Sequence, residues 1–183
     1  MRHCNYENFR FIFLVFVSFA FAVTAGNAAL RTDILKKIYK LKKHSEGGMF
    51  SEVYTAPFNK DNRALAGSIY FLLEGNEISH FHQIDCDELW FYHEGCGLKI
   101  TALTEDERHE YLLGRNVENS EKQMVLIKKR TVFAAENIDK NSFTFISCVT
   151  TPKFNYDGFR LIGKNEIREK YPNIADEIDY LAY

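Results

Sequence analysis

The feature that most constrains this chain is a succession of short apolar segments that begins after Gly47-Gly48, with turn residues such as Glu74-Gly75-Asn76 between them. Strands that recur about every 8–12 residues with turns between them are typical of a β-sandwich or a β-barrel. Aromatic residues make up 15% of the chain, which suits a pleated sheet because its surface accommodates aromatic side chains. The expected strands are 49–55, 67–73, 78–84, 88–93, 98–103, 111–113, 124–127, 131–135, 143–150 and 159–162.

Helices are expected on both sides of this strand region. Thr32 is a candidate cap for a helix over 33–43, with an apolar face formed by Ile34, Leu35, Ile38 and Leu41. The lysines on the rest of this helix indicate a solvated face, and a membrane-surface helix is the alternative. A second helix is expected at 165–170, ended by Tyr171-Pro172, and a last short helix in the tail 174–183.

The first 29 residues have the composition of a targeting segment. Basic Arg2 and Arg10 come before an uncharged run from Phe11 to Val23, and small residues follow that run. This order is that of a secretory signal peptide, and the run is shorter than the about 20 residues that a membrane-spanning helix needs. We therefore expect residues 1–29 to be a signal peptide cleaved near Gly26, or otherwise a retained membrane anchor. The protein would then be secreted, periplasmic or anchored through its N-terminus.

Residues 30–183 are expected to form one domain, because a domain usually takes about 100–200 residues. The net charge is −2 and no arginine-rich groove is visible in the sequence, so a nucleic-acid partner is not expected. The expected partners are a small-molecule ligand and a second copy of the chain, with membrane contact only through the N-terminal segment.

Four cysteines do not form a disulfide framework. Cys86 and Cys96 lie at opposite ends of one expected strand, farther apart than the Cα separation of about 7 Å that a disulfide allows. Cys148 lies in an apolar strand and is interpreted as a core residue, and Cys4 would leave with the signal peptide. The spacing also lacks the CxxC pairs of structural zinc sites.

The stretch from Gly75 to Gly95 holds the clearest candidates for chemistry. His80 and His82 are two apart in an expected strand and so should share a face, and Glu88 follows on the next strand. Two imidazoles and a carboxylate on a rigid sheet can bind a divalent metal. The alternative is that one histidine is hydrogen-bonded in a polar barrel mouth and the other lies at the surface.

This stretch resembles the first motif of the cupin superfamily, in which a glycine, His-x-His, an acidic residue and a second glycine follow in that order. More specifically, the chain is similar to the cupin branch formerly catalogued as a domain of unknown function, the fifth cupin family. The similarity extends from about Lys36 to Tyr171. The motifs that carry it are His44-Ser45-Glu46-Gly47-Gly48-Met49-Phe50, Ser68-Ile69-Tyr70-Phe71-Leu72-Leu73, Ser79-His80-Phe81-His82, Asp87-Glu88-Leu89-Trp90 and Val149-Thr150-Thr151-Pro152-Lys153-Phe154.

The resemblance implies an all-β fold: a single cupin barrel, that is, a double-stranded β-helix or jelly roll, with a short N-terminal helix and a C-terminal helical tail. It also implies that Ile78, His80, His82 and Ile84 face a ligand cavity inside the barrel. The usual second-motif histidine is replaced here by Phe133. We therefore expect no resident cofactor, and the alternative is a divalent metal on His80, His82 and Glu88.

Three functions remain open at this point. The first is a sugar isomerase or epimerase with His82 as base, Glu88 orienting it and a tyrosine such as Tyr70 as acid, since the deoxysugar epimerases share the fold. The second is a metal-dependent oxygenase or lyase, and the third is a non-catalytic binding module. Further ligand-binding candidates are His80, Glu46, Tyr92 and His44, although His44 and Glu46 before Gly47-Gly48 are also typical of a helix end.

Overall fold

The computed structural model describes residues 27–57, 59–60, 62–104 and 107–183. The apolar run and most of the predicted signal peptide or anchor lie outside these residues. Within the described ranges, no helix is both long and apolar enough to cross a membrane.

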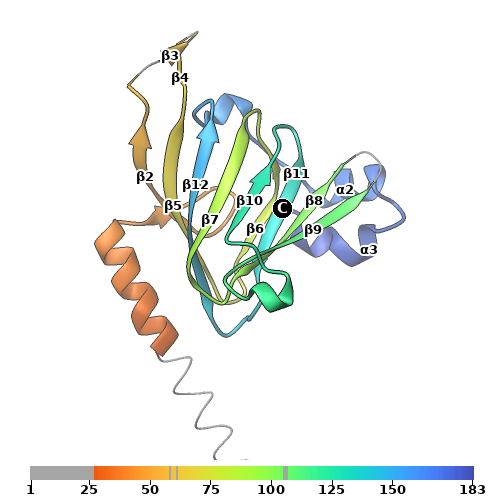
Figure 1. Ribbon diagram of the computed structural model, residues 1–183. Coiled ribbons are helices and arrows are strands. Elements are labelled where there is room, and N and C mark those ends of the chain that lie inside the picture. Colours follow the sequence, from red (N-terminus) through yellow and green to blue (C-terminus); the bar gives the residue numbers. More distant parts are fainter. Residues whose placement is uncertain (1–26, 58, 61, 105–106) are drawn as a thin grey trace, which may run out of the picture.

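Two antiparallel sheets face each other and form the predicted jelly-roll barrel (Figure 1). From β5 to β8, and again from β9 to β13, successive strands alternate between the two sheets, and β12 lies between β5 and β7 while β11 lies between β6 and β8. One sheet has the order β1 (Lys42–Lys43), β2 (Met49–Thr55), β5 (Gly67–Glu74), β12 (Phe143–Thr151), β7 (Asp87–Gly95) and β10 (Met124–Ile127). The other has the order β13 (Arg160–Leu161), β6 (Ile78–Gln83), β11 (Val132–Asn137), β8 (Leu98–Leu103) and β9 (Arg108–Leu113), and β3 (Asn59–Lys60) pairs with β4 (Arg63–Ala64).

The helices lie outside the barrel. The C-terminal group comprises α2 (Lys164–Lys170), α3 (Ala175–Ile178) and η3 (Asp179–Leu181), and two short 3-10 turns are η1 (Val117–Asn119) and η2 (Tyr156–Gly158). The strands predicted at 98–103 and 124–127 and the helix at 165–170 agree with the structure to within a residue. Cys86, Cys96 and Cys148 are free thiols, as expected.

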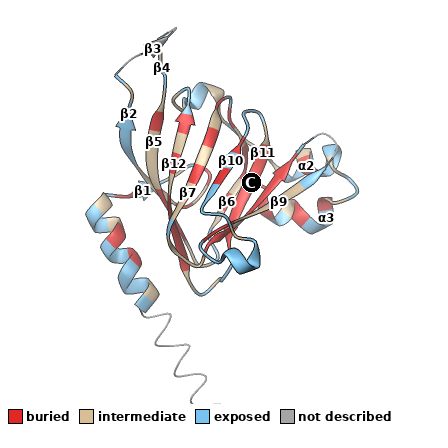
Figure 2. Cartoon of the chain, viewed as in Figure 1, coloured by how far each residue is buried: buried red, intermediate tan, exposed pale blue. Residues whose placement is uncertain are grey.

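The core has three parts, which the burial pattern in Figure 2 follows along the strands. The largest fills the space between the two sheets and includes Phe71, Trp90 and Phe133. A second joins the outer face of the five-stranded sheet to the C-terminal helices through Phe81, Ile162 and Leu181. A third packs the N-terminal helix against Leu72, Phe143 and Phe145 on the outer face of the six-stranded sheet. Both barrel walls are therefore covered on the outside.

The N-terminal helix differs from the prediction in its bounds and its cap. It is described over 27–39 and ends at Lys40, which has a φ of 52°. Thr32 does not cap it, because this residue lies within the helix and its hydroxyl donates to the carbonyl oxygen of Ala29 at 3.0 Å. Leu35 is buried as expected, but Ile38 is 64% exposed. The described part of the helix, 27–39, crosses the boundary expected between residues 29 and 30.

The strand β6 contains a bulge that breaks the predicted alternation of side chains. His82 is opposite Phe133 and Ser79 is opposite Ala135, so a step of three residues on β6 matches a step of two on β11. An extra residue of this kind turns the following side chains to the other face. As a result Ser79 and His82 face the barrel interior, where both contact Glu46. Phe81 faces outward, toward the C-terminal helices.

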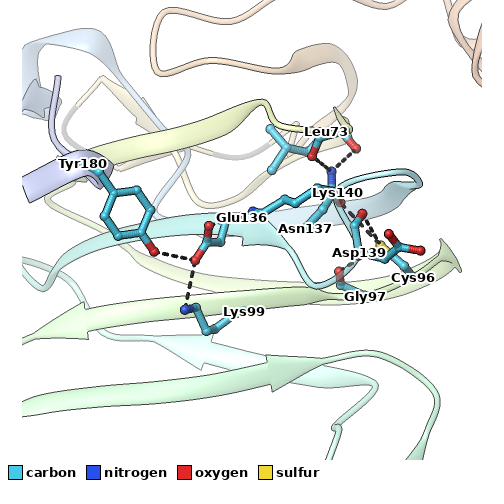
Figure 3. Close-up of polar contacts among 10 residues, drawn as sticks. Leu73, Cys96, Gly97, Lys99, Glu136, Asn137, Asp139, Lys140 and Tyr180 are labelled. Atoms are coloured by element: carbon cyan, nitrogen blue, oxygen red, sulfur yellow. Dashed lines mark hydrogen bonds and ion pairs between the residues drawn. The ribbon is translucent and has the colours of Figure 1, made fainter. Parts of the chain in front are cut away.

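A buried carboxylate ties the C-terminal tail to the five-stranded sheet (Figure 3). Glu136 accepts a hydrogen bond from the Tyr180 hydroxyl at 2.8 Å and forms ion pairs with Lys99 at 2.9 Å and Lys140 at 2.7 Å. The neighbouring Asn137 amide donates to the carbonyl oxygens of Leu73 and Gly75 at 3.0 Å each. Each of these polar groups has a hydrogen-bond or ion-pair partner within the protein, so the cluster stabilises the fold.

Gly47 holds the loop that carries His44 and Glu46 against β6. Its φ is +112°, and a Cβ atom at this position would lie 2.0 Å from the carbonyl oxygen of Ile78. We expect Gly47→Ala to lower the free energy of unfolding by at least about 1–3 kcal/mol, because side chains are strained at such a φ. Urea unfolding measures this, with Ser45→Ala as the exposed control in the same loop, expected to change stability by less than about 0.5 kcal/mol. Equal stability of the two variants would contradict this account of the loop.

Candidate functional site

A cavity of about 320 Å³ opens at one end of the barrel, between the two sheets. This volume is within the range of about 300–1,000 Å³ that small-molecule sites usually have. Its walls come from β2, β5, β6, β7 and β12, from the loop before β2 and from the segment after β12. The lining side chains most relevant to chemistry are His44, Glu46, Glu52, His82, Glu88, Trp90, Cys148, Thr150 and Lys153.

His82 is buried and faces this cavity, as the sequence predicted. Its Nδ1 lies 2.7 Å from the carbonyl oxygen of His80, and since a carbonyl oxygen only accepts, Nδ1 carries the proton. The prediction that Glu88 holds this ring nitrogen is therefore wrong, because the backbone of the β6 bulge occupies it. Burial lowers the pKa of His82, so the neutral ring presents an unprotonated Nε2.

Glu46 brings a carboxyl group to that Nε2. Its Oε2 lies 3.3 Å from Nε2 of His82 and 3.4 Å from Nδ1 of His44, and its Oε1 accepts a hydrogen bond from Ser79 at 2.8 Å. The loop is fixed on β6 because the backbone N–H of His80 donates to the Glu46 carbonyl oxygen at 2.8 Å. Burial raises the pKa of Glu46 and lowers that of His44. His44 and Glu46, two of the ligand-binding candidates, both line the cavity.

Glu88 is a second buried carboxyl group in the same cavity, on β7 of the opposite sheet. Burial is the main cause that raises its pKa to about 7, and the negative charge of Glu46 adds to the effect. The nearby Trp90 indole and Cys148 thiol act in the other direction. At neutral pH the cavity thus holds a neutral imidazole together with a carboxyl group that is partly protonated. One group can take a proton and the other can give one.

The raised pKa of Glu88 predicts a specific dependence of stability on pH. The folded pKa, about 7, lies above the unfolded value of about 4.3, so the native state binds more protons within this window. Stability conferred by the protonated carboxyl is therefore lost as pH rises through it. Glu88→Gln should remove this loss and exceed the wild type in stability by about 3 kcal/mol at pH 8, with little difference at pH 4.

Urea unfolding of the wild type and Glu88→Gln from pH 4 to 8 measures this effect. The difference between the two curves isolates Glu88, because the buried histidines His44 and His82 titrate in both proteins with the opposite slope. A difference that stays constant with pH would contradict the assignment.

Three predicted site residues do not line the cavity. The bulge turns His80 away, so that its Nδ1 lies 3.2 Å from the carbonyl oxygen of Leu181 in η3. Tyr70 faces outward beneath the N-terminal helix, where its ring lies 4.5 Å from that of Tyr39. Tyr92 packs against the main core and its hydroxyl donates to the carbonyl oxygen of Gly95 at 2.7 Å. The tyrosine acid predicted beside His82 is therefore wrong for Tyr70.

The alternative metal set does not fit this geometry. His80 points away from His82 and Glu88, and Phe133 lies opposite His82 where the second cupin motif supplies a histidine. In the part of the chain that the structure describes, no three His, Cys, Asp or Glu side chains converge as metal ligands.

Several cavity residues were not predicted as site residues. Trp90 is both a core residue and part of the cavity wall. Ser79 holds Glu46, and Phe154 and Tyr156 pack around the His44 ring. Lys153 at the mouth is paired with Glu52 at 2.8 Å. The motifs at Asp87–Trp90 and Val149–Phe154 contained Trp90, Lys153 and Phe154, but a one-dimensional pattern does not show which residues meet.

Comparisons with known proteins agree with this architecture. The model of the family described as Cupin superfamily (DUF985) matches residues 34–162. A crystal structure of a Shewanella oneidensis protein is similar with a TM-score of 0.79 and 29% identity, over 82% of this chain and 96% of that one. A hypothetical protein from Leishmania major gives 0.76 and 26%, over 82% and 98%.

A more distant match concerns the fold alone. Oxalate decarboxylase from Bacillus subtilis has a TM-score of 0.51 and 14% identity, over 76% of this chain and 36% of that one. No functionally curated protein matches the chain. The family match covers most of the barrel, including the loop with His44 and Glu46 and the strands with His82 and Glu88. The chain belongs to the cupin superfamily, in the family described as DUF985.

Proposed function

We propose that this protein binds a small, sugar-like carbonyl compound in the barrel cavity and isomerises or epimerises it by proton transfer, with His82 as the base. The observation that carries the proposal is the fixed orientation of His82. Its Nδ1 is held by the His80 carbonyl oxygen at 2.7 Å, which leaves an unprotonated Nε2 toward Glu46 and the cavity. A base held in one tautomer suits abstraction of a proton next to a carbonyl group.

The second group in the reaction is Glu88, in place of the tyrosine that the sequence suggested. In the first step Nε2 of His82 takes the proton from the carbon next to the carbonyl, while protonated Glu88 gives its proton to the carbonyl oxygen. The product of this step is an enediol. To form the isomer, His82 gives its proton to the former carbonyl carbon while Glu88 takes the hydroxyl proton from the other oxygen, which restores both groups. To form the epimer, the enediol turns over in the cavity, His82 returns the proton to the other face of the same carbon, and Glu88 takes back the proton it gave. Ser79 holds Glu46, and the Glu46 carboxylate beside Nε2 stabilises the imidazolium that forms when His82 takes the proton.

A panel of free ketoses and aldoses tests this proposal, with products identified by NMR. We expect at least one sugar to be converted, and Tyr70→Phe to react at the wild-type rate because Tyr70 lies on the outer face of β5. Binding without conversion of any sugar would favour the non-catalytic binding module instead. The metal-dependent alternative has no supporting observation, since His80 does not join His82 and Glu88.

We also propose that the chain is exported, by the order of charged, apolar and small residues in 1–29. Cleavage near Gly26 would leave intact the helix described over 27–39. Protein sequencing of material from the cell envelope should find a start near Gly26, and a start at Met1 in a membrane-free cytosolic fraction would refute export.

The expected homodimer is a further proposal, which sedimentation of the purified protein decides.

A further inference from the structure

The indole N–H of Trp90 is a donor inside the cavity that the fold leaves without an acceptor. Trp90 is 1% exposed and lies in the cavity wall. Among the described residues, its Nε1 is the buried side-chain polar atom that has no hydrogen-bond partner. Buried donors are nearly always paired, so an unpaired one in a ligand-sized cavity calls for an acceptor from outside the chain.

The ring that carries this donor is held in place. Its centroid lies 6.2 Å from that of Phe71 and 6.0 Å from that of Phe133. Glu88 lies two residues earlier on the same face of β7, and while burial raises the Glu88 pKa, contact with the indole acts to lower it. The distance and angles of this contact do not meet those of a hydrogen bond, so the indole N–H stays unpaired. The N–H is therefore preorganised for an atom that enters the cavity.

The position of Trp90 relative to His82 indicates how a molecule in the cavity is oriented when its acceptor atom binds the indole. Phe133 packs against both side chains, with its ring 4.2 Å from that of His82 and 6.0 Å from that of Trp90. His82 is on β6 and Trp90 is on β7, which belong to opposite sheets. A small molecule in the cavity can thus present one side to the base and the other to the indole donor.

We propose that the Trp90 indole N–H binds the carbonyl oxygen of the substrate, which makes the substrate an α-hydroxy ketone or aldehyde oriented with its oxygen toward β7 and its reactive C–H toward His82. This inference rests on the proposed function. An indole nitrogen only donates, so its partner is an acceptor. The bond strengthens as negative charge develops on that oxygen during proton removal, so Trp90 lowers the barrier as well as binding.

Because the chain contains one tryptophan, the indole ¹⁵N–¹H resonance reports on Trp90 without ambiguity. The full-length protein as purified is titrated with hydroxyacetone and with 1,2-propanediol, which differ in the carbonyl group, and then with D-fructose and its alditol D-sorbitol. We expect the indole proton to move downfield with the two ketones and to stay in place with the two polyols. No shift with either ketone, or equal shifts with the matched polyols, would overturn the inference.

The variant Trp90→Phe supplies the kinetic test. It keeps an aromatic ring against Phe71 and Phe133 but removes the N–H, and it should lower turnover by about 10²–10³-fold, as loss of one such donor does. Full turnover in a folded variant would overturn the inference. If this variant does not fold, the titration of the wild type still decides.

The two proposals fail in different ways. Turnover without an indole shift would refute the role of Trp90 and leave the isomerase proposal standing. A shift of the indole resonance with ketones, without conversion of any sugar and without exchange of its hydrogens for solvent deuterium, would refute the isomerase proposal. Trp90 would then remain a carbonyl-binding residue.

Discussion

Replacing His82 by alanine should reduce turnover of the sugar substrate by about 10²–10⁴-fold, the range over which a general base contributes. The reason is positional, because the β6 bulge holds Nδ1 of His82 and leaves the unprotonated Nε2 at the cavity. The fold should survive, since the core between the two sheets has many other members besides the contact between this ring and Phe133. Steady-state kinetics by NMR, together with circular dichroism, measures both effects.

The matched control is His109→Ala, which removes an exposed histidine on β9 whose ring lies 3.6 Å from Glu107. It should leave turnover unchanged. Glu46→Gln should give an intermediate loss, because the Glu46 carboxylate stabilises the protonated ring without taking the substrate proton. If His82→Ala turns over substrate at the wild-type rate, the base is another residue and the mechanism is wrong.

Replacing Phe81 by alanine should lower the free energy of unfolding by about 3–5 kcal/mol, which is typical of a large aromatic side chain removed from a core. Phe81 is 0% exposed and packs against Ile162 and Leu181, which joins the outer face of β6 to the C-terminal helices. For a chain of this size the melting temperature should fall by roughly 2–4 °C per kcal/mol. Thermal and urea unfolding measure the loss.

The control for this change is Tyr54→Ala on β2, where the aromatic side chain is 51% exposed. It should alter stability by less than about 0.5 kcal/mol. Phe81→Ala should also keep the cavity residues in place, because Phe81 and His82 face opposite sides of β6. A loss below about 1 kcal/mol would mean that the C-terminal helices do not cover this side chain as described.

The strand pattern was predictable because it depends on local information. Turn residues and short apolar segments define β8 and β10 to the residue, and the family motifs define their order in a jelly roll. The predicted face of His82 is confirmed as well. The sequence did not show that the C-terminal group of helices covers Phe81.

The rest depends on contacts that a local pattern does not contain. A period of two residues predicts that His80 and His82 share a face, and the bulge between Ser79 and His82 breaks this rule. The carboxyl group beside His82 comes from Glu46, 36 positions away in the sequence, and a backbone contact to His80 holds it there. The sequence does not show which face of the sheet Tyr70 occupies, because this depends on how the N-terminal helix packs.

The most direct test of the proton-transfer site is exchange with solvent deuterium. A ketose such as D-fructose is incubated in D₂O with the wild-type protein, and the hydrogens next to the carbonyl are followed by NMR. The account predicts that deuterium enters at one of the carbons next to the carbonyl, at a rate that depends on His82 and on protonated Glu88 and so falls above about pH 7. Exchange at the rate of the protein-free solution across the ketoses and aldoses would contradict it.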